Sequence, residues 1–180
     1  MKRKNQSNIL AREYITTALI KLANEKPLSS ISISELTQKA GVSRMTYYRN
    51  YSSKEEILET YMNEIVAAYR VDLEKMGTPK TYGNYENILH CFRYFKKYQS
   101  FLNCIIKIGM GKLLLDALTS YLLETYHKDS TDTALYYSLQ AYAGALFNIY
   151  MAWTANGYKE SIEELASIIQ SPTLTSGADK

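Results

Sequence analysis

The chain is poor in helix-breaking and metal-binding residues. Its 180 residues include only 3 prolines and 8 glycines, and 46% are apolar. Because β-sandwiches and barrels need many Gly- and Pro-rich turns, this composition favours an all-α fold with a sizeable core. The 2 cysteines, Cys91 and Cys104, form no Cys-x-x-Cys motif, and no histidine spacing completes a set of four ligands. We expect no bound metal and no disulfide, and interpret both cysteines as buried apolar residues, with a redox role as the alternative.

Long apolar runs are also missing. Lys107, Lys112 and Asp116 interrupt the best candidate, which lies between Phe101 and Leu123. No segment therefore reaches the roughly 18 to 20 apolar residues of a membrane span. The N-terminus starts with charged and polar residues and lacks the apolar stretch of a secretory signal. We expect a cytoplasmic protein with no membrane partner.

The sequence also lacks recognisable catalytic motifs. The thiol and imidazole side chains that could serve as nucleophile or base are His90, Cys91, Cys104 and His127, and none of them stands in a known motif. The sequence therefore predicts neither an enzyme, nor a catalytic residue, nor a cofactor.

Residues 32 to 54, SISELTQKAGVSRMTYYRNYSSK, carry the most informative pattern of the chain. Ser32 and Glu35 stand three residues apart before an apolar pattern, as in a capping box, and predict a helix that starts directly after the serine. Gly41 can adopt the positive φ that ends this helix, and Ser43 can cap a second one. Two short helices joined by a tight turn form a helix-turn-helix, which indicates DNA binding.

The second of these helices carries side chains that suit a nucleic acid better than a core. Its donors to base edges and phosphate oxygens are Arg44, Thr46, Tyr48, Arg49 and Asn50. Residues 1 to 60 hold ten Lys and Arg against six acids, a net charge of +4, whereas the other 120 residues have a net charge of −1. This excess supports DNA binding. A purely structural helical bundle is the alternative, and the basic tip at residues 2 to 4 is either a phosphate-seeking arm or a solvated terminus.

The run AGVSRMTYYRNYSSKEEIL at residues 40 to 58 resembles the TetR family of transcriptional regulators. A glycine turn, a capping serine, an aromatic-rich recognition helix and a lysine that opens the next helix fall at the family's spacings. An apolar stripe from about Asn8 to Asn24 fits the family's first helix. The resemblance implies that the operator is contacted by Ser32, Ser34, Arg44, Met45, Thr46, Tyr48, Arg49, Asn50 and Lys54. Lys54 would clamp a phosphate, and Tyr47 and Tyr51 would pack inward.

We expect two helical domains joined by one long helix. The DNA-binding domain covers residues 1–53 and the connecting helix residues 54–75. Two glycines and a proline then mark a break, after which a ligand-binding and dimerisation domain covers residues 76–170 and a flexible tail residues 171–180. The predicted helices of the second domain are residues 85–97, 99–108, 112–126, 132–155 and 161–170.

The segment from Thr133 to Ile169 predicts an interface with a second copy of the chain. Its first helix is apolar nearly all round, as in helices buried on several sides, and Ser161 with Glu164 caps a second, amphipathic helix. The pattern resembles a TetR subgroup that includes dihydroxyacetone kinase regulators, in which the last two helices form a four-helix bundle with a second subunit. The interface residues would be Ala141, Gly144, Ala145, Asn148, Trp153, Ile162, Leu165 and Ile169. The alternative is that both helices complete a monomer core.

The resemblance further implies a homodimeric repressor of a palindromic operator, relieved when a small molecule binds in the second domain. Aromatic walls with hydroxyl tips suit a flat, partly polar ligand. The candidate lining residues are Phe92, Phe95, Tyr98, Phe101, Tyr121, Tyr137, Phe147 and Tyr150. Tyrosines also fill helical cores, and that interpretation stays open. The alternative function is a coactivator or interaction protein of the same fold that acts through a partner regulator.

Overall fold

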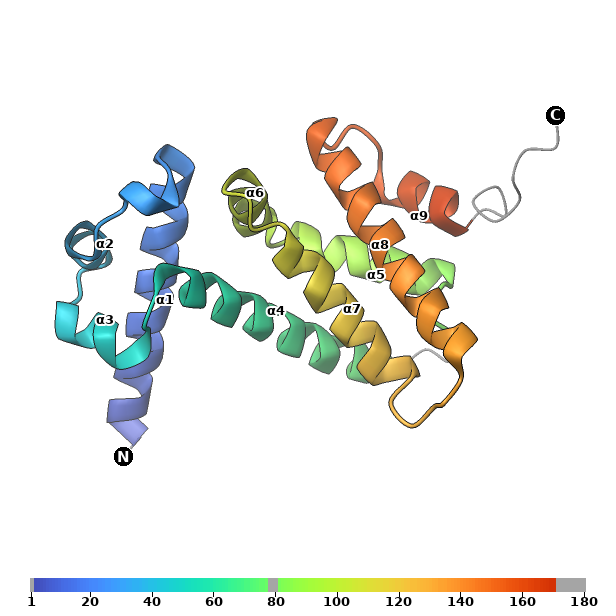
Figure 1. The fold of residues 1–180 in the computed structure, drawn as a ribbon, viewed down its shortest axis with the longest axis horizontal. Helices are drawn as coiled ribbons and strands as arrows, with labels where there is room; N and C mark the ends of the chain where they lie inside the picture. Colours follow the sequence, from blue (N-terminus) through green and yellow to red (C-terminus); the bar gives the residue numbers. More distant parts are fainter. Residues whose placement is uncertain (1, 78–80, 171–180) are drawn as a thin grey trace. The chain divides into compact units, whose positions relative to one another are not determined.

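The computed structural model describes residues 2–77 and 81–170, with only the backbone for residues 2–5. In this part of the chain the secondary structure is entirely helical, as the composition predicts (Figure 1). The elements are α1 (Lys2–Glu25), the 3-10 turn η1 (Leu28–Ser30), α2 (Ile33–Ala40), α3 (Arg44–Asn50), α4 (Lys54–Met76), α5 (Tyr85–Lys96), α6 (Gln99–Lys107), α7 (Lys112–Tyr126), α8 (Thr133–Ala155) and α9 (Ile162–Gln170).

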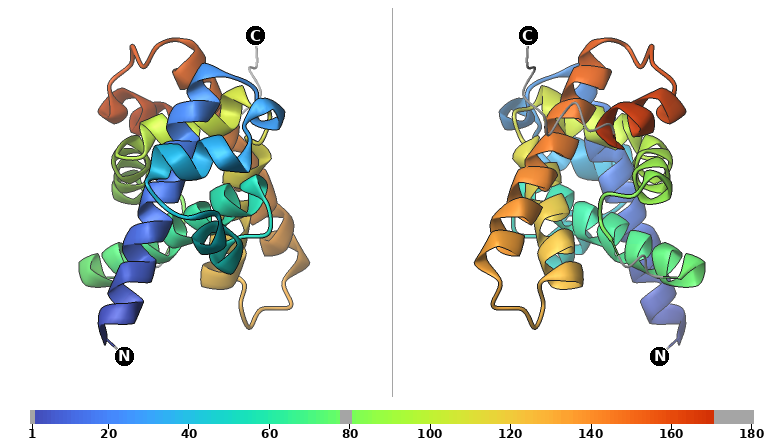
Figure 2. Two further views of the ribbon diagram at one scale, coloured as in Figure 1. Left: turned by 90° about the vertical axis from the view of Figure 1, so that its left-hand side faces the viewer. Right: turned by 90° about the vertical axis from the view of Figure 1, so that its right-hand side faces the viewer.

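Two compact units divide the chain. The first consists of the residues up to Ile65 together with Ser100–Leu113, and so contains α1, α2, α3, the first part of α4, and α6. The apolar stripe of α1 forms its core, with Ile15 and Leu19 fully buried, and α2 packs across α1 (Figure 2). The three-helix core that the sequence predicts is therefore present.

α6 belongs to this first unit rather than to the second domain, where its position in the sequence suggested it would be. The ammonium group of Lys107 donates to the backbone carbonyl oxygen of Asn24 at 2.5 Å. The ring of Phe101 packs edge-on against the ring of Tyr61, with 4.8 Å between the centroids. The compact unit therefore extends beyond the boundary expected at residue 53, because these contacts join residues that are far apart in the sequence.

The second unit contains α4 from Val66 onward, α5, α7, α8 and α9. α7 and α8 form a helical hairpin, and α9 packs on α5 (Figures 1 and 2). Arg93 of α5 and Glu163 of α9 form an ion pair at 2.6 Å. Trp153 of α8 is 2% exposed, and its indole N–H donates to the backbone carbonyl oxygen of Glu160 at 3.0 Å.

The predicted boundaries of the five helices from residue 85 onward agree closely with the structure. The segment predicted at residues 112–126 coincides with α7, and α5, α6, α8 and α9 each begin and end within one residue of prediction. α1 is longer than predicted, since it begins at Lys2 rather than near Asn8. The predicted tail at 171–180 and the side chains of the basic tip lie outside the described residues. None of the described helices is both long and apolar enough to cross a bilayer.

Candidate nucleic-acid interface

α2 begins at the predicted serine cap. Ser32 has an extended backbone, and its Oγ accepts a hydrogen bond from the backbone N–H of Glu35 at 3.2 Å. The Glu35 carboxylate accepts from the Lys26 ammonium at 2.6 and 2.7 Å. That ammonium lowers the pKa of Glu35, and the backbone N–H of Ser32 also lowers it, in line with the predicted capping box. Ser32 and Ser34 are exposed at this helix start, where free backbone N–H groups attract anions.

The turn between the two helices depends on Gly41. Its φ of 66° is left-handed, a conformation that strains residues with a side chain, and its N–H donates to the carbonyl oxygen of Gln38 at 3.2 Å. Ser43 then caps α3, because its Oγ accepts from the backbone N–H of Thr46 at 3.1 Å. Both caps and the glycine turn are as predicted, so residues 33–50 form a helix-turn-helix.

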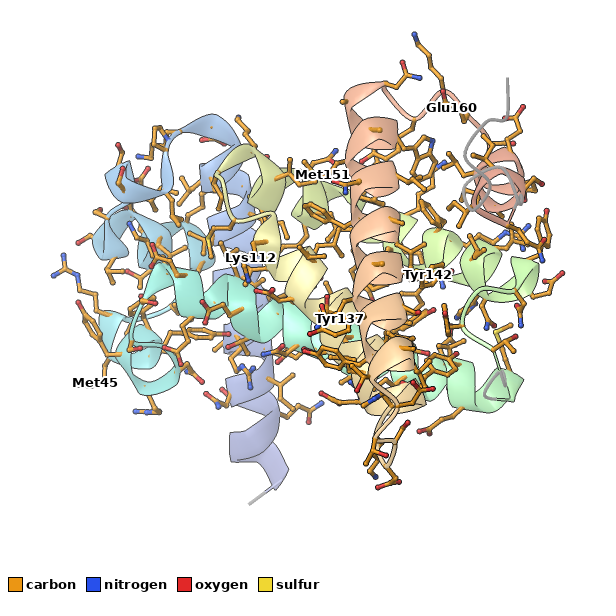
Figure 3. All side chains as sticks on the ribbon, turned by 45° about the vertical axis from the view of Figure 1, so that its right-hand side comes forward. Met45, Lys112, Tyr137, Tyr142, Met151 and Glu160 are labelled. Atoms are coloured by element: carbon orange, nitrogen blue, oxygen red, sulfur yellow. The ribbon has the colours of Figure 1, made fainter. Side chains whose placement is uncertain are left out.

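α3 has one buried face and one exposed face. Tyr47 and Tyr51 are 1% and 4% exposed, with 6.3 Å between their ring centroids, which confirms that both pack inward. Met45 and Tyr48 are 69% and 62% exposed, and Met45 projects from α3 to the outside (Figure 3). These two large side chains lie three residues apart on one face of α3, within the helix-turn-helix, so the outer face of α3 is the candidate interface.

Two polar contacts organise this outer face. The guanidinium of Arg44 donates to the hydroxyl oxygen of Ser34 in a short hydrogen bond that ties the start of α3 to the start of α2. The side-chain amide of Asn50 donates to the carbonyl oxygen of Thr46 at 2.8 Å. Arg44 and Arg49 are exposed, whereas Thr46 and Asn50 are half-buried. The arginines are therefore more accessible to a nucleic acid than the asparagine amide.

Lys54 has a different environment from the one predicted. Its ammonium group donates to the carbonyl oxygens of Leu28 at 2.5 Å and Ile31 at 2.7 Å. These carbonyls belong to the turn η1 and the residue that follows it. Lys54 thus connects the start of α4 to the chain before α2, and two of its three N–H donors are used there.

Two family models match the chain. The model described as "Bacterial regulatory proteins, tetR family" matches residues 15–61, which include the helix-turn-helix. The model described as "Transcriptional regulator C-terminal region" matches residues 84–173. The chain belongs to the TetR family. It is therefore a DNA-binding transcriptional regulator, as its N-terminal pattern predicts.

Solved structures share the fold of this TetR-family chain. "Dihydroxyacetone kinase operon activator DhaS" superposes with a TM-score of 0.62 at 23% identity, over 89% of this chain and 92% of that one. A TetR transcriptional regulator from Rhodococcus sp. RHA1 gives 0.59 at 19% identity, over 89% and 92%. The fatty acid degradation regulator FadR from Bacillus halodurans gives 0.58 at 16% identity, over 90% and 93%. Comparison with curated proteins finds none that matches the chain.

The second unit of this TetR-family chain holds two small adjoining cavities. One, of about 30 Å³, is lined by residues of α4, α5, α7 and α8 and by Tyr82, and the other, of about 20 Å³, by residues of α5, α7 and α8. Of the predicted ligand residues, Phe92, Phe95, Tyr121 and Tyr150 line them. Ligand pockets usually measure about 300 to 1,000 Å³. Both cavities are therefore nearly filled by the side chains around them.

The other four predicted ligand residues lie elsewhere. Tyr98 packs on Tyr94, with ring centroids 5.5 Å apart. Tyr137 is 66% exposed on α8, and Phe147 is half-buried. Phe101 lies in the first unit, so its predicted place in the second domain is corrected. Aromatic residue type alone did not distinguish a cavity wall from a helix surface.

The larger of these cavities is surrounded by hydroxyl and thiol groups that were not among the predicted ligand-binding residues. Its lining includes Tyr69, Tyr82, Cys91, Tyr126 and Tyr142. Burial raises the pKa of Tyr69, Tyr126 and Tyr142, and raises that of the Cys91 thiol to about 12. These groups stay protonated at neutral pH and can donate hydrogen bonds. Tyr69 was missed because it lies on α4, which was assigned to a connecting helix.

The predicted dimer residues separate into a buried and an exposed set. Trp153, Leu165 and Ile169 are buried within their own unit, as the monomer-core alternative expected. Ala141 and Asn148 are exposed on α8, and Gly144, Ala145 and Ile162 are half-exposed. Tyr137, which was not predicted for the interface, extends the exposed stripe of α8 by one turn, with Met151 further along the helix (Figure 3). This α8 stripe comprises Tyr137, Ala141, Gly144, Ala145, Asn148 and Ala152.

Proposed function

We propose that the chain is a homodimeric repressor that binds a palindromic operator and releases it when a small molecule enters the second unit. The observation that carries this proposal is the outer face of α3, where exposed Met45, Tyr48, Arg44 and Arg49 stand beside the capped start of α2. The chain acts by binding, and no step of the proposal needs catalysis.

The outer face of α3 suits the major groove. Arginine can read guanine through two hydrogen bonds, and a tyrosine hydroxyl can bind a phosphate or a base edge. Arg44 is held against Ser34, so the first turns of both helices present donors side by side. Ser32, Ser34 and the N–H groups of α2 would take a backbone phosphate, while Met45, Thr46 and Asn50 would complete the contact to the groove.

Dimerisation would supply the second half-site. The α8 stripe consists mostly of small residues, which let two helices approach closely, and Tyr137 at its end could pack on a partner. Two modules in one dimer would read half-sites about 34 to 36 Å apart, or a multiple of that distance. Ile162 of α9 would border this interface.

An effector would have to open the core of the second unit. Cavities of about 30 and 20 Å³ hold hardly more than a water molecule each. Leu118 and Leu146 line both cavities, so displacing them would join the two spaces beside the tyrosine hydroxyls of the larger one. Tyr69 and Leu73 of α4 line the larger cavity, so a ligand there would act on the helix that also starts beside the helix-turn-helix.

A second candidate is a coactivator that works through a partner regulator. The small cavities favour it, because a regulator without an effector needs no ligand space. One of the similar structures is titled an operon activator, which is consistent with this alternative. In that case the protein would bind DNA weakly alone and tightly with its partner.

The test is fluorescence-anisotropy binding to DNA upstream of the protein's own gene, across a salt series. An Arg44→Ala, Tyr48→Ala double variant should lose about tenfold or more in affinity, since each base contact contributes roughly 1 to 3 kcal/mol. The matched control is Arg93→Ala with Tyr136→Ala, which removes the same side chains from α5 and α8 and should bind normally. Equal binding by both double variants would refute the role of α3.

The sign of regulation needs a reporter. A promoter that becomes more active when the gene is deleted supports repression, and one that becomes less active supports the activator alternative. Purified wild-type protein that is folded but binds only when a second protein is added would identify the coactivator.

A further inference from the structure

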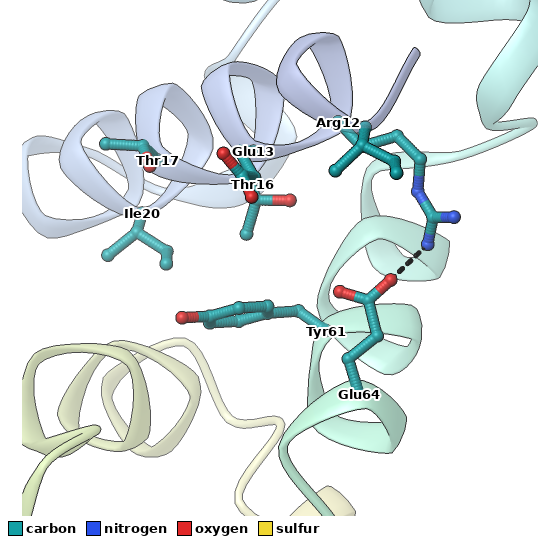
Figure 4. Close-up of a pocket in the computed structure, with 8 residues that line it drawn as sticks. Arg12, Glu13, Thr16, Thr17, Ile20, Tyr61 and Glu64 are labelled. Atoms are coloured by element: carbon teal, nitrogen blue, oxygen red, sulfur yellow. Dashed lines mark hydrogen bonds and ion pairs between the residues drawn. The ribbon is translucent and has the colours of Figure 1, made fainter. Parts of the chain in front are cut away.

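A larger cavity lies in the first unit, between α1 and the part of α4 that belongs to that unit (Figure 4). Its volume is about 240 Å³. A cavity of about 150 Å³ accommodates a benzene ring, so this one has room for a ring with a short polar chain. The lining residues are Ile9, Arg12, Glu13, Thr16, Thr17, Ile20, Tyr61 and Glu64.

The walls of this cavity are apolar on one side and fixed in place. The ring of Tyr61 crosses below Thr16 and Ile20 (Figure 4), and its edge-on contact with Phe101, with centroids 4.8 Å apart, supports it from behind. Thr16 is 6% exposed, although its side chain is polar. Because the lining combines an aromatic ring and two isoleucines with several polar and charged groups, it suits a ligand that has an apolar body and a charged end.

The charges of the lining favour a positively charged ligand. Glu13 and Glu64 carry two negative charges, and Arg12 carries one positive charge that is already paired with Glu64 in a short ion pair. The lining is therefore net negative. An anion would face the like charge of Glu13 and would have to displace Glu64 from its ion pair with Arg12. A cation instead provides an opposite charge for both carboxylates.

We propose that this cavity binds a small organic cation, a protonated amine on a flat aromatic body, and that the bound cation weakens DNA binding. The amine lies between Glu13 and Glu64, and the body lies on the ring of Tyr61. The effect on DNA rests on the proposed function of α3, whereas the binding of the amine does not.

Arg12 provides the connection to the recognition helix. Its Nε donates to the phenol oxygen of Tyr51 at 3.3 Å, and its guanidinium lies 5.9 Å from the centre of that ring. Tyr51 ends α3, and its backbone N–H donates to the carbonyl oxygen of Tyr47 at 2.9 Å. A bound cation competes with Arg12 for the Glu64 carboxylate. The resulting movement of Arg12 changes the position of Tyr51 and with it the end of α3.

Binding is tested first by NMR, with benzylamine as the probe and benzyl alcohol and benzoate as its neutral and anionic counterparts. Benzylamine should shift the backbone signals of Thr16, Thr17 and Tyr61 in a saturable way, and at least ten times more tightly than the alcohol or benzoate. Glu64→Gln and Glu13→Gln should each weaken the amine about tenfold. Glu59→Gln removes the same charge from an exposed site on α4 outside the cavity, and should bind the amine like the wild type.

The second test repeats the DNA titration with saturating benzylamine at constant ionic strength. Affinity should fall severalfold in the wild type and in Glu59→Gln at the lowest benzylamine concentration that saturates them, and should fall less at that concentration in Glu64→Gln and Glu13→Gln. Equal binding of amine and alcohol, or unchanged binding in both cavity variants, overturns the site. Amine binding without loss of DNA affinity overturns the connection through Arg12. If the protein binds DNA but not the amine, this inference is refuted and the proposed function is not. If the protein binds the amine but not DNA, only the proposed function is refuted.

Discussion

The ammonium group of Lys54 donates to the backbone carbonyl oxygen of Leu28 at 2.5 Å. With the second bond, to Ile31 at 2.7 Å, this side chain holds the turn η1 against the start of α4. Lys54→Met should therefore lower the free energy of unfolding by about 1.5 to 3 kcal/mol, the usual contribution of a hydrogen bond to a charged group. Urea unfolding measures this change directly.

The same variant tests the phosphate contact that the family resemblance suggested. Each phosphate contact contributes about 0.9 to the slope of log affinity against log salt. We expect Lys54→Met to leave that slope nearly unchanged and Arg49→Ala to reduce it. A reduced slope with unchanged stability in Lys54→Met would instead assign the lysine to the DNA.

The ion pair between Lys26 and Glu35 should make stability depend on pH. Lys26 lowers the pKa of Glu35 below its ordinary value of 4.5, so the folded state favours the ionised carboxylate. This contribution is fully present above pH 4.5 and is lost as the pH falls through the lower value of the folded state. The difference in stability between wild type and Glu35→Gln should therefore shrink in acid, as measured by urea unfolding across that range.

Lys26→Met supplies the control for this titration. In that background, the pH dependence of the Glu35→Gln effect should become smaller, because the carboxylate has lost the ammonium group that lowers its pKa most and keeps only the Ser32 backbone and Lys39. A pH-dependent difference of the same size without Lys26 would contradict the assignment.

Two serine caps show how far the sequence predicts local structure. Ser161 and Glu164 make both bonds of a capping box, at 3.1 Å and 2.7 Å. Ser32 and Glu35 have the same spacing, but there the carboxylate is shared between the Ser32 backbone and the Lys26 ammonium. Spacing predicts where a helix begins, since the cap lies within four residues of its partner. It does not predict competition from a side chain nine residues away.

The candidate interface on α3 was also predictable, because it depends on residues that lie close together in the sequence. Tyr47 and Tyr51 are both buried and lie about one helical turn apart, whereas Tyr48, one residue after Tyr47, is exposed, so the two faces of α3 follow from position alone. Lys54 and Phe101 were not predictable, because their partners, Leu28 and Tyr61, come from distant segments. Trp153 was assigned to a dimer interface because a helix that is apolar all round does not specify which neighbour covers each side.

The reactivity of Cys91 should report on opening of the second unit. Burial raises the pKa of its thiol to about 12, and the thiolate is the reactive form. Both cysteines should therefore react slowly with Ellman's reagent in the native protein, and both should react quickly in urea. An effector that opens the cavities should accelerate labelling of Cys91, which a Cys104→Ser variant isolates. Cys91 is half-buried, so fast labelling of the native protein without any ligand would contradict the raised pKa of its thiol.

A substitution at Gly144 tests dimerisation separately from the stability of the single protomer. A Cβ added at this position meets no atom within 4 Å, so a side chain can leave the backbone there without a clash in the isolated protomer. Replacing a half-exposed helical glycine with a better helix former should even stabilise that protomer, by up to about 1 kcal/mol. Gly144→Leu should nevertheless separate the dimer into monomers, because the new side chain would enter the space of the partner's α8 stripe.

Sedimentation velocity over a concentration series measures this dissociation. Ser120→Leu, at an exposed position of α7, is the matched control. Gly144→Leu should unfold at an unchanged or higher temperature at concentrations where the wild type is monomeric. Its affinity for a two-half-site DNA should fall to that for a single half-site, since a lone module keeps only half of the contacts. If Gly144→Leu forms dimers as readily as the control, the α8 stripe is not the interface, and the partner must bind elsewhere on the second unit.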